Sequence, residues 1–128
     1  MARYLAIVKW PLVILVANAL VFGFVDSGYG DFGTILFNLV RVVVIVWAGW
    51  LLVEKAQVSV ALASFIGPTF LFIDHVVLGG GIGLVRYEED RGAFFGGILI
   101  SYLMFFPVAL LFSALGGYAA KGASGEAK

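Results

Sequence analysis

A few polar and ionisable side chains interrupt the long apolar stretches of this 128-residue chain. Arg41 and Asp74 carry opposite charges, and His75 is the single histidine. The set is completed by the neutral hydrogen-bonding residues Asn18, Asn38, Ser101 and Tyr102. Ionisable groups in hydrocarbon are costly and normally face a partner, a ligand or water. These residues are therefore the candidates for an ion pair, a proton pathway or a binding site.

An ion pair between Arg41 and Asp74 is the central prediction for this cluster. A guanidinium group keeps its proton even in apolar surroundings, so Arg41 requires an acceptor. Asn38 precedes Arg41 by three residues and shares its helix face, and Asp74 lies at a similar depth on a neighbouring segment. A buried pair also needs further hydrogen bonds, which we expect from Asn18, Asn38, His75 and Tyr102.

Three interpretations of this intramembrane polar cluster are open. The first is a structural lock that fixes which helices pair. The second is a substrate or proton pathway through Asp74 and His75, and the third is pairing with another subunit. The lock is favoured because the cluster lies in one half of the bilayer and no ionisable residue continues it toward the other face.

The sequence shows no arrangement of catalytic or metal-binding residues. It has no cysteine, and one histidine cannot supply both axial ligands of a haem within a chain. The glycine run at residues 79–81 lacks the Lys-Ser/Thr pair of a phosphate loop. We therefore predict no catalytic residue, metal or cofactor, and we expect that the protein is not an enzyme. A net charge of zero without a basic cluster argues against nucleic acid as a partner.

Hydropathy predicts the elements that position these side chains. The chain is 62% hydrophobic and 12% charged, and a membrane span needs about 20 mostly apolar residues. Four stretches meet that requirement: residues 5–25, 34–53, 58–78 and 93–119. We predict an all-α fold, an integral membrane four-helix transmembrane bundle that forms a single domain over residues 1–128. Its loops are short, and residues 121–128 are expected to form a solvated polar tail.

The connections carry further expectations. The second connection, residues 54–57, is so short that the second and third spans should be antiparallel neighbours. The glycines at 79–81 and 83 either unwind the end of the third span or continue it as a helix to Val85. The acidic string at residues 86–91 is interpreted as a solvated loop, with attraction of a cation or a basic partner as the alternative.

Small residues four positions apart are candidates for close helix contacts. The pairs are Ala63 with Gly67, Gly79 with Gly83, Ser113 with Gly117, and Gly116 with Ala120. The three prolines, Pro11, Pro68 and Pro107, are expected to bend their helices.

The distribution of basic residues predicts the orientation. With four spans, both termini and the second connection share one face, which holds Arg3, Lys9, Lys55, Lys121 and Lys128. Basic residues in short loops are retained in the cytoplasm, so we place both termini there and the protein in the cell inner membrane. Trp10, Trp47 and Trp50 fall toward the same interface and are interpreted as anchors in the aromatic belt.

The leading functional hypothesis is a small, non-catalytic accessory or structural subunit of a membrane complex. Its partners would be the lipid bilayer and either other membrane subunits or further copies of itself, because a four-helix unit of this size buries little surface alone. The alternative is a minimal oligomeric transporter or channel that uses Asp74 and His75 beside Arg41.

Overall fold

The computed structural model describes residues 2–25, 30–82 and 91–123, and nearly all of these are helical. Three long helices are α1 (Ala2–Val25), α2 (Gly30–Ala56) and α6 (Arg91–Ala123). Between α2 and α6 lies a third segment made of α3 (Val60–Ala63), α4 (Ile66–Leu71) and the π-helix η2 (Phe72–Gly79). The all-helical prediction is confirmed. Four helical segments are long and apolar enough to cross a membrane: Arg3–Val21, Ile35–Ala56, Val60–Ile82 and Phe95–Gly122.

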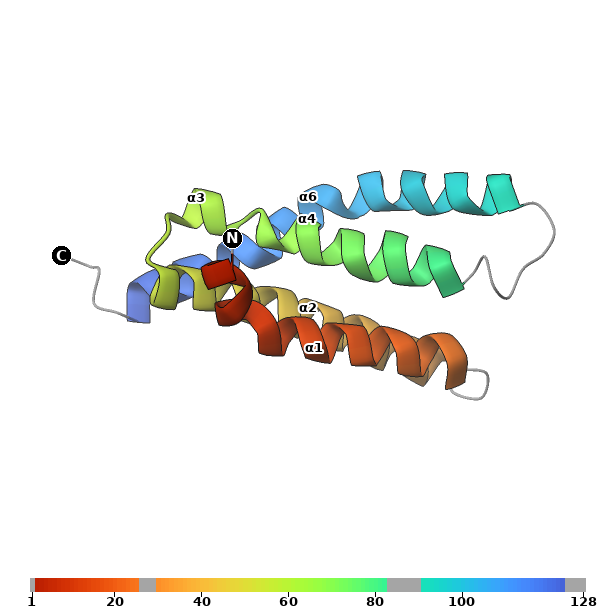
Figure 1. Cartoon of the computed structure of the whole chain (residues 1–128), viewed down its shortest axis with the longest axis horizontal. Helices are drawn as coiled ribbons and strands as arrows, with labels where there is room; N and C mark the ends of the chain where they lie inside the picture. Colours follow the sequence, from red (N-terminus) through yellow and green to blue (C-terminus); the bar gives the residue numbers. More distant parts are fainter. Residues whose placement is uncertain (1, 26–29, 83–90, 124–128) are drawn as a thin grey trace.

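The helices lie lengthwise beside one another (Figure 1). Helix α2 contacts both α1 and α6, and α4 contacts α6. The start of α1, the turn from α2 into α3 and the end of α6 all lie toward the same end of the molecule (Figure 1). The core is formed by buried aliphatic and aromatic side chains of α1, α2, α3 and α4, namely Val8, Leu15, Val44, Ile45, Ala48, Leu52, Ala56, Ala63 and Phe70.

Small residues bring α6 into close contact with α2 and α4. A Cβ atom added at Gly116 would overlap the carbonyl of Val46, and one at Gly49 would overlap the backbone of Ser113. A Cβ atom at Gly67 would overlap the backbone of Ala109. Such approaches are the basis of helix packing in lipid, where the hydrophobic effect does not drive helix association.

The predicted small-residue pairs have different outcomes. Ala63, Gly67, Ser113, Gly116 and Ala120 are all buried. A Cβ atom at Gly117 would meet the side chains of Val53 and Val60. For Gly79, the nearest described atom to an added Cβ is the Asp74 carbonyl of its own segment, so the described residues show no close helix contact there. Its partner Gly83 lies outside the described residues.

The third segment is broken, although the sequence predicts one span over 58–78. A turn at residues 64 and 65 separates α3 from α4. Pro68 follows, and because proline has no N–H, the carbonyl of Ser64 loses its helical donor. The Ser113 hydroxyl on α6 donates to that carbonyl instead. Tyr102 of α6 likewise donates to the carbonyl of Pro68, at 3.0 Å. Two hydroxyl groups of α6 thus bond to carbonyls of the broken segment, and the Pro68 carbonyl also accepts from the Phe72 amide.

Several predicted boundaries move. The third segment stays helical to Ile82, so the glycines at 79–81 do not unwind it, while 83–85 lie outside the described residues. Residues 30–33, predicted as loop, belong to α2, and residues 54–56 extend it at the other end. Residues 121–123, predicted as tail, belong to α6. Arg91 begins α6, and the remainder of the acidic string, like residues 26–29 and 124–128, is not described.

Candidate functional site

The predicted ion pair is present between α2 and η2. Arg41 Nε contacts Asp74 Oδ2, and the side chains are 16% and 1% exposed. Arg41 Nη1 also donates to Asn38 Oδ1 at 3.1 Å, and the guanidinium carbon lies 5.0 Å from the centre of the Phe37 ring. These contacts follow from the helix, which places residues three and four positions before Arg41 on its own face.

Asn18 and Tyr102 belong to the surroundings of the pair and do not bind it. Asn18 Nδ2 donates to the carbonyl of Phe37 at 3.3 Å, which ties α1 to the turn of α2 that also carries Arg41. The Tyr102 hydroxyl bonds to Pro68 instead. The Tyr102 ring lies edge-on to Phe72, with centroids 5.5 Å apart. Of the four residues expected to support the pair, Asn38 alone bonds to it within the described part of the chain.

Three buried polar atoms have no hydrogen-bond partner among the described residues: Asp74 Oδ1, Asp74 Oδ2 and His75 Nε2, of which Oδ2 is in ionic contact with Arg41. Both residues lie in η2, and the wide turn of a π-helix is often found at functional sites. Buried polar atoms without partners are rare in proteins, and each calls for an explanation. The sequence reveals both residues but not the π-helix that carries them.

A cavity of about 200 Å³ opens beside Arg41, between α2, α4 and α6. Arg41 and Asn38 supply its polar lining. The rest is mostly apolar, from Val42, Ile45, Leu71, Phe105, Val108 and Phe112. The sequence gives no signal for this cavity, because its walls come from three segments whose relative placement is tertiary.

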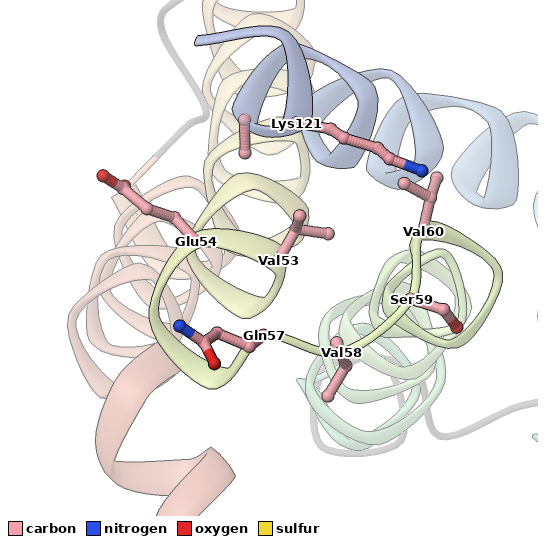
Figure 2. Close-up of a pocket in the computed structure, with 8 residues that line it drawn as sticks. Val53, Glu54, Gln57, Val58, Ser59, Val60 and Lys121 are labelled. Carbon is pink, nitrogen blue, oxygen red and sulfur yellow. The ribbon is translucent and has the colours of Figure 1, made fainter. Parts of the chain in front are cut away.

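A larger pocket of about 410 Å³ lies where α2 ends, α3 begins and α6 ends. Figure 2 shows the Lys121 amine on the side of Val60, whereas the Glu54 side chain extends outward on the opposite side. Gln57 in its wall has a φ of 58°, a left-handed conformation that turns the chain out of α2. Ser59 Oγ accepts from the Leu62 amide at 3.2 Å and so caps α3. None of these residues belongs to the predicted site.

Metal binding gains no support from this arrangement. Within residues 2–25, 30–82 and 91–123, no three His, Cys, Asp or Glu side chains gather in a way that could hold a metal ion.

No protein-family model, curated protein or solved structure matches this chain. The site is therefore interpreted from its own geometry and chemistry.

Proposed function

We propose that the protein is a multi-pass integral membrane protein that serves as a non-catalytic accessory or structural subunit of a membrane complex. The observation that carries this proposal is the low burial of α6. Only 11% of the apolar window of its span is buried inside the chain, against 44% for the third segment. Large apolar side chains such as Ile100, Leu103 and Met104 are 62%, 67% and 70% exposed on α6.

The outer face of α6 has room for another helix. Gly92, Gly96 and Gly97 have no atom within 4 Å of an added Cβ. Small residues of this kind let helix backbones approach closely in lipid. We propose that another membrane subunit, or a second copy of this chain, covers this face.

The Arg41 and Asp74 pair serves this function as a lock. It joins α2 to η2, and Asn18 joins α1 to α2 beside it. Removing one member of a buried pair is costly, so the pair selects one helix arrangement over others. We place the protein in the cell inner membrane with both termini in the cytoplasm, supported by the distribution of basic residues.

Purification in a mild detergent from cells with native expression tests the subunit role. We expect a partner in fixed stoichiometry, which Gly96→Trp should release because the indole would occupy the open face of α6. Leu39→Trp is the matched control on α2, where Leu39 is 56% exposed, and it should retain the partner. A strictly monomeric wild-type protein with transport activity would contradict the proposal.

A minimal oligomeric transporter or channel is the second candidate. It is favoured by one observation, the unbonded Asp74 Oδ1 and His75 Nε2 in the π-helix of a broken segment. Discontinuous helices line substrate and ion sites in many transporters. Asp74→Asn in proteoliposomes separates the two functions. Loss of flux at unchanged thermal stability would support transport, and loss of stability would support the lock.

A further inference from the structure

Arg41 has more hydrogen-bond donors than its contacts within the described residues use. Its guanidinium carries five N–H groups. In the described residues, Nε contacts Asp74 Oδ2 and Nη1 donates to Asn38 Oδ1, and the Arg41 side chain, which is 16% exposed, lines the cavity. In hydrocarbon, water is scarce and a charged donor without an acceptor is costly. An acceptor bound in the cavity would satisfy a further N–H group of Arg41.

The position of Arg41 suggests where that acceptor comes from. Arg41 follows Ile35, the start of the second span, by six residues, which is about 9 Å along the helix. Side chains on a helix lean toward its N-terminus, and the bond to Asn38 shows that Arg41 does so. The guanidinium therefore lies closer than the Arg41 backbone to the boundary between the hydrocarbon and the polar region of a bilayer.

The adjoining cavity defines the rest of the ligand. Its volume of about 200 Å³ exceeds the roughly 150 Å³ of an apolar cavity that accommodates benzene. It can hold a segment of several carbon atoms against Ile45, Leu71 and Phe112. Asp74 already compensates the charge of Arg41. The hydrogen-bond acceptor of the ligand is therefore best supplied by a neutral oxygen atom next to the carbon segment.

We propose that this cavity binds a membrane diacyl lipid. One glycerol-ester carbonyl accepts a hydrogen bond from Arg41, and the adjoining part of the acyl chain occupies the apolar cavity. The proposal rests on the membrane location proposed above, but it does not depend on the subunit role.

Titration of the delipidated, detergent-solubilised protein with two lipids tests the carbonyl contact. The probes are dipalmitoyl phosphatidylcholine and its dihexadecyl diether analogue, which lacks both ester carbonyls, and native mass spectrometry counts the bound molecules. We expect the diester to bind about tenfold more tightly, as suits one hydrogen bond to a charged group. Equal binding of the two lipids, or no binding to the folded wild-type protein, would overturn the proposal.

A pair of tryptophan variants tests the location. Val108→Trp fills the cavity without altering the ion pair and should remove the preference for the diester. Leu111→Trp is the control, because Leu111 lies on the same helix, is 57% exposed and does not line the cavity. Circular dichroism establishes that both variants are folded. A preference that survives Val108→Trp would place the lipid elsewhere, whereas a missing stoichiometric partner would affect only the subunit role.

Discussion

At the scale of single residues, Asp74 depends strongly on its ion-pair partner, because its side chain is only 1% exposed. We predict that Arg41→Leu lowers the free energy of unfolding by about 3–5 kcal/mol, because it leaves a buried carboxylate without its countercharge. The double variant Arg41→Leu with Asp74→Leu should recover most of the loss, since neither charge remains. Chemical unfolding in mixed micelles, followed by circular dichroism, measures both. A double variant no more stable than Arg41→Leu would contradict the lock.

Ser113 is the second residue whose removal should be costly. It is fully buried, and its hydroxyl donates to the Ser64 carbonyl that Pro68 leaves without a helical donor. Ser113→Ala should lower the free energy of unfolding by about 1–3 kcal/mol, the cost of a buried acceptor without a donor. In a Pro68→Ala background the amide of residue 68 can serve that carbonyl, so the same substitution should cost less. An unchanged cost in that background would show that Ser113 acts through packing alone.

At the scale of elements, the contact between α2 and α6 depends on the absence of side chains at their crossing. A Cβ at Gly116 would overlap the Val46 carbonyl, whereas nothing lies near an added Cβ at Gly97 on the same helix. We predict that Gly116→Ala is destabilising and that Gly97→Ala is neutral or stabilising. Both variants gain about 1 kcal/mol of helix propensity, while only Gly116→Ala suffers overpacking of about 1–3 kcal/mol. Equal free energies of unfolding for the two variants in detergent would show that α2 and α6 move apart at little cost to admit the added methyl group.

At the scale of the whole molecule, the ends of α2 and α6 lie at the same end, away from the start of α6 (Figure 1). The chain has no cysteine, so labelling of a single introduced cysteine by a membrane-impermeant maleimide measures the exposure of that one position. Lys55→Cys and Lys121→Cys should react only after the cells are permeabilised, because basic residues of short loops are retained in the cytoplasm. Gly92→Cys, near the start of α6, should react in intact cells. The reverse pattern would place both termini outside.

The sequence by itself determined the features that follow from the cost of polar groups in an apolar chain. Length and hydropathy predict four helical segments long enough to cross a membrane, and the short connection after α2 requires an immediate reversal. The Arg41 and Asp74 pair was also predictable, because the apolar spans hold one arginine at that depth and one carboxylate able to meet it. Few partners satisfy a guanidinium away from water, so the choice was narrow.

The tertiary structure alone decided which backbone carbonyls bond to side chains of other helices and where a cavity lies between the helices. Tyr102 was expected at the ion pair, but its hydroxyl bonds to Pro68 because the broken third segment presents that carbonyl to α6. Gly49 has no small residue four positions away in the sequence, yet the backbone of Ser113 lies against it. The π-helix around Asp74 and the cavity beside Arg41 likewise depend on how the third segment, α2 and α6 fit together. Such contacts form between residues far apart in the chain, and local residue patterns do not encode their geometry.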